Sequence, residues 1–314
     1  MADKLLTTEH LCVEFSVPEG SVCAVSDLSI SVYEQEILCL LGESGCGKSV
    51  FGNTILRLLP DNATTSGKIE FDGKSLLSMS DKEFLQYRGK EIAWIPQSAA
   101  TSLNPLIRCG KQVDEVYRLH VENDRKKARE NTLSLFKMLG LPRLPELAEV
   151  YPHELSGGMR QRVLVALGTS AEPKFVVVDE PTKGLDWARK QEVVERIGYM
   201  QKKCRSAMLL ITHDFSVAKT LANHIAVMYA GEVVEYSDAD SVIDKPMHPY
   251  TKGMISSLPQ NGFKAIPGFS PPLTAIPDGC RFHKRCPNAK PECEKTHPEL
   301  RQCGEGHQVR CLYA

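Results

Sequence analysis

The strongest chemical pattern in the sequence is a glycine-rich loop that ends in a lysine and a serine. It has the form G-x-x-x-x-G-K-S, in which glycines let backbone N–H groups approach phosphate oxygens at the start of a helix. The lysine ammonium group reaches the β- and γ-phosphates, and the serine hydroxyl binds magnesium. We therefore expect a site for ATP and Mg²⁺ rather than a mere tight turn. The expected site residues are Gly42, Glu43, Ser44, Gly45, Cys46, Gly47, Lys48, Ser49 and Val50, with Cys46 contributing only its backbone.

A second pattern is an apolar run, residues 175–178, that ends in two adjacent carboxylates, Asp179 and Glu180. Burying two anions costs several kcal/mol unless a cation or a polar partner compensates, and magnesium is the natural compensation. We expect Asp179 to hold Mg²⁺ through water. Glu180 is then the general base that orients the attacking water, a role worth about 10² to 10⁴ in rate. The alternative is a strand end with two solvated acids, which the phosphate loop makes the weaker interpretation.

A third pattern lies between these two, where a serine and two glycines open a predicted helix at about 159–170. Such a helix start is a second anion-binding site. The whole set resembles the ATP-binding-cassette ATPases, whose signature sequence it matches at Leu155, Ser156, Gly157, Gly158, Met159, Arg160 and Gln161. The resemblance implies that Ser156, Gly157 and Gly158 bind the γ-phosphate of ATP held by the phosphate loop of a partner subunit.

Three further positions match this family one by one. Gln97, after a predicted strand at 91–95, is similar to the glutamine that senses magnesium and the permease. His213, after another predicted strand, resembles the switch histidine that contacts the γ-phosphate. Asp186 resembles the aspartate that signals across the dimer. A lone histidine is usually structural, and only its place in this series favours the functional role of His213.

The sequence departs from the common family pattern in two places. Met159 stands where glutamine is usual, and the segment KGLD at 183–186 replaces the usual SALD. Neither change removes a catalytic group. The second bears on whether the two ATP sites of a dimer are equivalent.

Phe15 is the candidate for stacking on the adenine base. Stacking of an aromatic side chain on a base is worth about 1–3 kcal/mol. The alternative is a strand phenylalanine that faces the core, because the loop at residues 18–20 obscures the register of the strand.

The C-terminal segment has a different composition from the rest of the chain. Of 11 cysteines in the sequence, five fall after residue 279: Cys280, Cys286, Cys293, Cys303 and Cys311. Four thiolates in so short a segment satisfy either a tetrahedral zinc ion or an iron–sulfur cluster, and a segment below about 40 residues usually needs such a staple to fold. Free thiols or disulfides are the remaining alternative.

The ends of the chain are similar to the peptide and nickel importer branch of the same family. The matching segments are TSLNP at 101–105, MHPYTKG at 247–253 and GCRFHKRCP at 279–287. This resemblance implies a 4Fe-4S cluster, with Cys303 outside the ligand set Cys280, Cys286, Cys293 and Cys311. It also implies two membrane permeases, an external solute-binding protein and a second ATPase subunit. A related but distinct second subunit is expected, with a homodimer as the alternative.

The elements that must position these residues indicate an α/β fold. A strand at 37–41 precedes the phosphate loop and a helix at 50–59 follows it. Strands at 175–179, 207–211 and 225–229 alternate with helices at about 187–203 and 214–222, which is typical of a mainly parallel sheet. We expect an antiparallel β subdomain and a helical insertion at about 106–172. The predicted domains are an ATP-binding-cassette domain at 1–258, a proline-rich linker at 259–279 and a metal-binding segment at 280–314.

Composition limits the partners. The net charge is −1, which lacks the basic footprint of a nucleic-acid-binding protein. No apolar run approaches the roughly 18 to 20 residues that cross a bilayer, and no secretory signal is apparent, so we expect a peripheral protein at the cytoplasmic face of the membrane.

The sequence therefore predicts ATP hydrolysis that drives import of peptides or related solutes, with nickel or metal chelates left open. The alternative is a soluble mechanical ATPase acting on nucleic acid or ribosomes. Such proteins typically carry two cassettes or a long coiled-coil insertion, and neither is found in the sequence.

Overall fold

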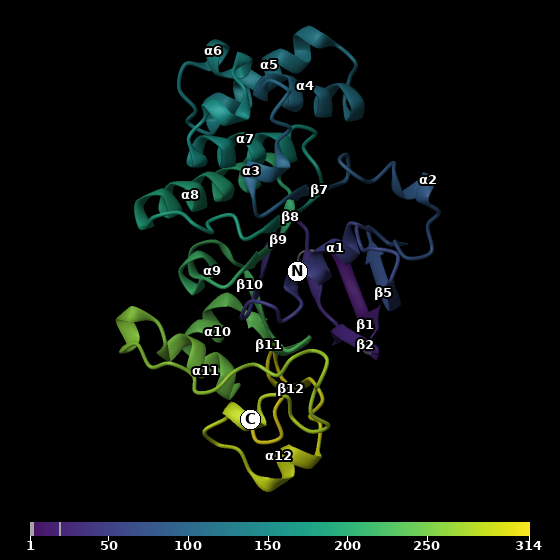
Figure 1. The fold of residues 1–314 in the computed structure, drawn as a ribbon, viewed down its shortest axis with the longest axis vertical. Coiled ribbons are helices and arrows are strands. Elements are labelled where there is room, and N and C mark those ends of the chain that lie inside the picture. The colour runs from purple at the N-terminus through teal and green to yellow at the C-terminus, as the bar shows by residue number, and fades with distance from the viewer. Residues whose placement is uncertain (1–2, 19) are drawn as a thin grey trace. The chain divides into compact units, whose positions relative to one another are not determined.

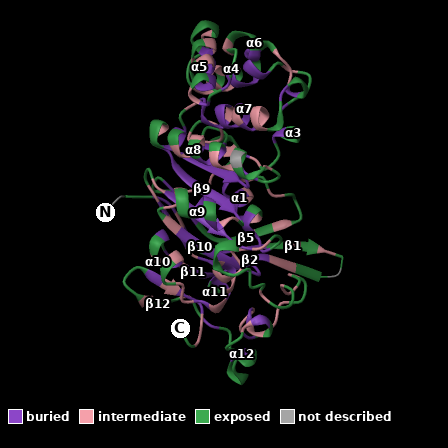
Figure 2. Ribbon diagram, turned by 90° about the vertical axis from the view of Figure 1, so that its left-hand side faces the viewer, coloured by how far each residue is buried: buried purple, intermediate pink, exposed green. Residues whose placement is uncertain are grey.

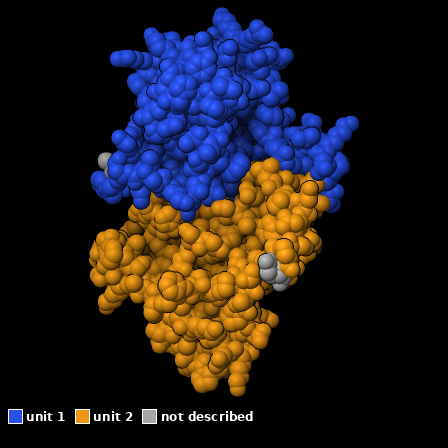
Figure 3. All heavy atoms as spheres, in the orientation of Figure 1, with its two compact units in different colours: residues 1–3, 33–35, 78–210 blue, residues 4–32, 36–77, 211–314 orange. Residues whose placement is uncertain are grey.

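The computed structural model describes residues 3–18 and 20–314. These residues form two compact units whose segments alternate along the chain, coloured separately in Figure 3. Unit 1 is built mainly from Ser78–Leu210, and unit 2 from Lys4–Val32, Glu36–Leu77 and Ile211–Ala314. None of the helices in the described ranges has the length and apolar character needed to span a membrane.

Unit 2 contains the predicted antiparallel β subdomain. Its strands are β1 (Lys4–Val17), β2 (Gly20–Leu28), β3 (Ser31–Tyr33), β5 (Ala63–Phe71) and β6 (Lys74–Ser75). They lie in the order β2-β1-β5-β6, with β3 paired to β1. Alternate residues of β1 and β5 are buried, among them Val13, Ile69 and Phe71, as expected for a sheet with one face on the core.

A second set of strands in unit 2 carries the phosphate loop. Strand β4 (Ile37–Leu41) is buried at all five positions, as its unbroken apolar sequence predicts. It runs parallel to β10 (His224–Tyr229), which pairs antiparallel with β11 (Glu232–Asp238). Strand β11 then pairs with β13 (His307–Val309), and β13 with β12 (Arg301–Gly304). The cysteine-rich segment therefore extends this sheet, although its composition sets it apart.

The helices of unit 2 are short, and α9 (Phe215–Leu221) and α10 (Ala239–Asp244) lie beside β10 and β11 (Figure 1). The helix predicted at 50–59 is α1 (Lys48–Ile55), which begins two residues earlier and stops before Pro60. Its end is marked by Arg57, which has a φ of +52° and cannot continue a right-handed helix. The others are α11 (Pro249–Ser256) and α12 (Pro291–Lys295).

Unit 1 combines buried parallel strands with the predicted helical insertion. Strands β7 (Ile92–Ile95) and β8 (Phe175–Asp179) are parallel neighbours, and β9 (Ala207–Thr212) starts in this unit. Described residues between 106 and 172 contain no strand, which confirms the insertion. Its helices are α4 (Cys109–His120), α5 (Arg125–Met138), α6 (Leu144–Glu149) and α7 (Gly157–Thr169), with α3 (Ala99–Ser102) before them and α8 (Trp187–Cys204) after β8. Figure 2 shows buried residues concentrated on the strands, whereas the helices expose their outer faces.

A buried glutamate joins the cysteine-rich segment to the rest of unit 2. Glu235 on β11 is fully buried. It accepts hydrogen bonds from the backbone N–H groups of Met247 and His248, at 2.7 and 2.9 Å, and pairs with Nε2 of His307 at 2.7 Å. A buried carboxylate is tolerated only with such partners, so Glu235 fixes both the turn before α11 and strand β13.

We predict that Glu235→Ala lowers the free energy of unfolding by about 3 kcal/mol, because it leaves the N–H groups of Met247 and His248 and the buried side chain of His307 without their acceptor. Urea unfolding of the full chain measures this. Glu305→Ala, at an exposed position of the same segment, is the matched control and should change the free energy of unfolding by less than about 0.5 kcal/mol. Equal effects of the two substitutions would contradict the role of Glu235.

Candidate functional site

The phosphate loop of unit 2 is shaped by close backbone contacts. A Cβ atom on Gly42 would lie 2.3 Å from the carbonyl oxygen of Met228, and one on Gly47 would lie 2.2 Å from that of Ala24. Gly47 also has a φ of +107° and stands at the start of α1. No side chain fits either position, so these glycines are required by the packing as well as by the phosphate-binding pattern.

Lysine 48 is folded back along the loop. Its side chain is buried, and Nζ donates hydrogen bonds of 2.8 Å to the carbonyl oxygens of Gly42 and Glu43. Ser49, directly after it, is exposed at the start of α1, as are Ser44 and Gly45 in the loop. The ammonium group is thus held beside the loop, and Ser49 is accessible to solvent, so its hydroxyl can bind a metal ion.

Cysteine 46 points away from solvent. Its side chain is buried, and burial raises the pKa of the thiol. Its carbonyl oxygen accepts a hydrogen bond from the N–H of Gly231 at 2.9 Å. Val50 is half-buried on α1. Ser44 and Gly45, in the middle of the loop, are therefore exposed. The buried Cys46 holds the loop against the chain at Gly231.

The predicted carboxylate pair lies in unit 1, at the end of β8. Asp179 is the last residue of the strand and Glu180 follows it, and both side chains are buried, with 8% and 7% of their surface exposed. Glu180 has a φ of +45°, in the left-handed region that costs a non-glycine residue about 1–3 kcal/mol. Backbone strain of this kind persists where the surrounding structure dictates the conformation, and it is common at functional sites.

Unit 1 also contains a cavity of about 390 Å³ that joins Gln97 to the start of the signature helix. Gln97 lines it together with Gly157, Gln161 and Lys183. The structure thus brings together two predicted site residues that are 60 positions apart in the sequence.

Two predicted residues of unit 1 cap helices. Ser156 is exposed and caps α7, where its Oγ accepts a hydrogen bond from the N–H of Met159 at 3.3 Å. Asp186 is exposed and caps α8 by accepting from the N–H of Arg189 at 3.0 Å. Neither of them, nor Gly158, is among the described residues that line the cavity at Gln97.

The remaining predicted nucleotide residues belong to unit 2. His213 is exposed and directly follows β9. Phe15 lies on β1 opposite Val22 on one side and Ala63 on the other, and it is half-buried, so it is not a fully buried core residue. The structure thus describes the phosphate loop, His213 and Phe15 within unit 2, and the carboxylates, Gln97, the signature and Asp186 within unit 1.

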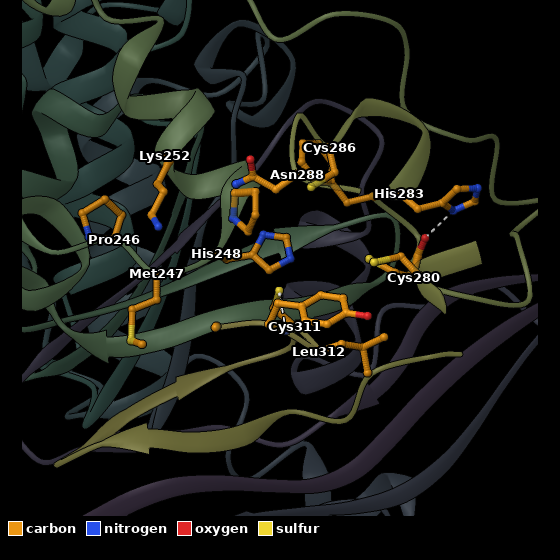
Figure 4. Close-up of a pocket in the computed structure, with 15 residues that line it drawn as sticks. Pro246, Met247, His248, Lys252, Cys280, His283, Cys286, Asn288, Cys311 and Leu312 are labelled. Carbon is orange, nitrogen blue, oxygen red and sulfur yellow. Dashed lines mark hydrogen bonds between the residues drawn. The ribbon is translucent and has the colours of Figure 1, made fainter. Parts of the chain in front are cut away.

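Four of the five C-terminal cysteines line one cavity of unit 2, with a volume of about 290 Å³. They are the predicted set Cys280, Cys286, Cys293 and Cys311, and Figure 4 shows the sulfur atoms of Cys280, Cys286 and Cys311 directed into the cavity. Cys303, on β12, is not among the described residues that line it. Burial raises the pKa of Cys280 to about 11, so this thiol is protonated at neutral pH when no cation is near.

The structure does not confirm the predicted metal-binding segment, because no three or more His, Cys, Asp or Glu side chains in the described ranges form a group that could hold a metal ion. The cavity also receives His248, which is fully buried, and Lys252 from α11. Burial lowers the pKa of His248 to about 3, so this imidazole is neutral. Its Nδ1 accepts from the N–H of Tyr250 at 3.1 Å, which occupies one of its two ring nitrogens.

Sequence reasoning missed two residues that contact the phosphate loop. Arg285 makes a two-bond ion pair with Glu43, and the hydroxyl of Tyr250 accepts a hydrogen bond from the N–H of Glu43. Both lie in segments, 247–253 and 279–287, that sequence analysis used only as marks of resemblance. The sequence did contain one signal for such a partner. Glu43 places a negative charge inside a loop expected to bind phosphate, and such a charge is expected to have a cation beside it.

Comparison with known proteins agrees with this arrangement. The family model described as ABC transporter matches residues 25–183, and the one described as oligopeptide/dipeptide transporter, C-terminal region, matches residues 234–293. The chain is 38% identical over 316 residues to the dipeptide transport ATP-binding protein DppD of Bacillus subtilis (strain 168), covering 98% of this chain and 94% of that protein. It is 39% identical over 318 residues to the probable D,D-dipeptide transport ATP-binding protein DdpD of Escherichia coli (strain K12), covering 99% and 96%.

A solved structure shares the fold. The ATP-binding cassette MJ0796, in a dimeric post-hydrolysis state bound to ADP and Pi, superposes with a TM-score of 0.67 at 24% identity, covering 75% of this chain and 99% of that chain. The sequence relatives extend over nearly the full chain, including the cysteine-rich segment. The chain therefore belongs to the ABC transporter family, as an ATP-binding protein that carries the C-terminal region of oligopeptide and dipeptide transporters.

Proposed function

We propose that this ABC ATPase drives import of dipeptides or oligopeptides through a membrane permease complex. The observation that carries the proposal is the near full-length similarity to ATP-binding proteins of dipeptide and oligopeptide transporters, at 36–39% identity. The names of these relatives favour peptides over nickel or metal chelates, which the sequence alone leaves open. No observation in the described residues favours the alternative of a mechanical ATPase on nucleic acid or ribosomes.

The phosphate loop is proposed to bind the phosphates of ATP. Lys48 is held beside the loop, and from there its ammonium group can turn to the β- and γ-phosphates of ATP. Mg²⁺, when bound, neutralises charge that develops on the transferred phosphoryl group. The hydroxyl of Ser49, the carboxylate of Asp179 and the amide of Gln97 are the groups that would hold it. Phe15 is the candidate for stacking on adenine, and the residue is half-buried rather than fully buried in the core.

Glu180 is proposed to be the general base for hydrolysis. A general base must accept a proton from the attacking water while staying fixed in orientation. The burial of Glu180 and its strained backbone both support a fixed orientation. His213, exposed after β9, is proposed to contact the γ-phosphate, and Gln97 to report its state to the permease through the cavity that it shares with the signature helix.

The signature is proposed to act on a second ATPase subunit. Ser156 and Gly157 are exposed at the N-terminal end of α7, and the backbone N–H groups at the start of a helix attract anions. Asp186 and Trp187 are exposed at the start of α8, and Trp187 has 76% of its surface accessible. We propose that these residues face a related second subunit, with a homodimer as the alternative. The complete machine would include two permeases and an external solute-binding protein, at the cytoplasmic face of the membrane.

We also propose that Cys280, Cys286, Cys293 and Cys311 hold a 4Fe-4S cluster. A tetrahedral zinc ion needs four sulfur atoms about 2.3 Å from one point. A cluster holds its thiolates farther apart, because each of them binds a different iron. The proposal is supported by the fact that all four cysteines line one cavity, and Lys252 in its wall offers a cation to an anionic cluster. A bound cluster would supply cross-links within a segment that has little core of its own.

Replacing Glu180 by Gln should reduce ATP hydrolysis by at least about 100-fold, because the amide cannot accept the proton of the attacking water. The Kd for ATP should stay within about twofold of wild type, because the phosphate loop is untouched. Phosphate release and nucleotide titration on the full chain measure the two quantities.

Glu195→Gln is the matched control for this substitution, since Glu195 is an exposed acid of α8 in the same unit. It should leave hydrolysis unchanged. Near-normal turnover in the Glu180→Gln variant would show that another group is the base.

Anaerobically purified protein should contain about four irons and four sulfides per chain and absorb broadly near 400 nm. Cys286→Ser should lose most of this iron, because it removes one of the four ligands. Cys303→Ser, which changes a cysteine outside the cavity, should retain it. Unchanged iron in the Cys286→Ser variant would contradict the ligand assignment, and one zinc without sulfide would replace the cluster by a zinc site.

A further inference from the structure

An arginine of the cysteine-rich segment reaches into the phosphate loop. Nη1 and Nη2 of Arg285 donate hydrogen bonds of 2.9 Å to Oε2 and Oε1 of Glu43. The arginine side chain is almost fully buried, with 6% of its surface exposed, and the glutamate is partly buried, with 33%. Such two-bond pairing between a guanidinium group and a carboxylate is both stronger and more directional than a single ion pair.

The guanidinium group is itself held in place. Nε donates to the carbonyl oxygen of Pro267 at 3.0 Å, and Nη1 also lies 3.4 Å from the hydroxyl oxygen of Tyr229. The central guanidinium carbon lies 5.6 Å from the ring centre of Tyr229 and 5.9 Å from that of Phe282. A side chain with this many contacts is already ordered before it meets its partner, so it can impose a position on Glu43.

The same loop residue is held a second time through its backbone. The N–H of Glu43 donates to the hydroxyl of Tyr250 at 3.1 Å. Tyr250 is fully buried on α11, and its ring packs against Tyr229 with 4.6 Å between ring centres. Glu43 is therefore fixed at both its side chain and its backbone, and its own carbonyl oxygen accepts from Nζ of Lys48.

The charge of Glu43 makes this contact matter for nucleotide binding. A carboxylate inside a loop that binds triphosphate repels the ligand, because like charges at short range disfavour each other. A paired guanidinium group offsets that repulsion without filling the loop. The pair also holds the first turn of the loop in one conformation, which lowers the ordering cost when phosphates bind.

We propose that Arg285 is a positioning residue for ATP binding, acting through Glu43 to neutralise and fix the phosphate loop. The inference rests on the proposed function in that the loop is taken to bind ATP. It makes the cysteine-rich segment part of the nucleotide site, since Arg285 directly precedes Cys286 in the wall of the cysteine cavity. The contact links residues separated by 242 positions in the sequence.

The test is the Kd for ATP of full-length variants, measured by nucleotide titration at a temperature where each variant is folded. Arg285→Gln should raise the Kd about tenfold, while kcat at saturating ATP changes by less than about threefold. Arg285→Lys keeps the charge but not the two-bond geometry, so its Kd should lie between those of Arg285→Gln and wild type. Arg301→Gln is the matched control, because Arg301 belongs to the same segment but donates to the backbone oxygens of Leu312 and Ala314 instead of Glu43.

A double substitution separates positioning from simple structural support. In Arg285→Gln the carboxylate of Glu43 is uncompensated, so adding Glu43→Gln should recover a substantial part of the lost affinity. A purely structural arginine gives no reason for such rescue, because the double variant has lost both charges of the pair. Thermal unfolding of each variant shows whether it is folded. If Arg285→Gln does not fold, the Kd values of Arg285→Lys and of the double variant are compared with wild type instead.

Two outcomes would overturn the inference. One is a Kd for folded Arg285→Gln within about twofold of wild type, and the other is a double variant that binds ATP no better than Arg285→Gln. In both cases wild-type protein binds and hydrolyses ATP, so the proposed function stands. Wild-type protein that binds no ATP would instead defeat the proposed function, and the role of Arg285 would fall with it.

Discussion

Two buried glutamates on strand β11 determine how the C-terminal third of unit 2 is assembled. Glu232 and Glu235 have 2% and 0% of their surface exposed, and a buried carboxylate must find cations or hydrogen-bond donors. Nearly all of those partners come from later in the chain. Glu232 lies 3.3 Å from Arg281 and 2.8 Å from His297, and Glu235 pairs with His307. The cysteine-rich segment is therefore drawn onto β11 by charge burial as well as by strand pairing.

The cysteine cavity and the arginine contact with the phosphate loop follow from that docking. Gly279 approaches the backbone at Cys293 so closely that a Cβ atom would lie 2.4 Å from its carbonyl oxygen, and the N–H of Cys280 bonds to the same oxygen at 2.8 Å. This crossing brings together cysteines that are widely spaced in the sequence. It also turns Arg285 toward β10 and the loop, where Tyr229, Tyr250 and Phe282 form one aromatic cluster. Phe282 thus lines the cysteine cavity and also packs against Arg285, which contacts the phosphate loop.

In unit 1 the functional side chains lie where regular elements end. Glu180 follows a fully buried strand, Ser156 and Asp186 cap helices, and Gln97 follows β7. Such positions combine a rigid scaffold with exposed polar groups, which suits residues that must meet a ligand or a second subunit. The strained backbone of Glu180 is the clearest sign that a local preference has been overridden there.

Sequence alone was sufficient wherever the determining physics is local. Hydrophobic runs, helix starts and glycine positions depend on neighbours in the chain, so β4, β8, the helical insertion, the signature helix and the phosphate loop were predicted close to their observed bounds. The four-cysteine set was also separable from Cys303 by resemblance. The boundary of α1 was less well placed, because the left-handed conformation of Arg57 is decided by packing.

Only the tertiary structure revealed the partners of buried charges. Glu232 and Glu235, which are buried, and Glu43, which is partly buried, look like ordinary surface acids in the sequence, because burial is a property of the assembled fold. Their partners Arg285, Arg281 and His307 are 242, 49 and 72 residues away. No periodic pattern encodes a contact at such distances, whereas the cost of an unpaired buried charge makes it obligatory once the chain has folded.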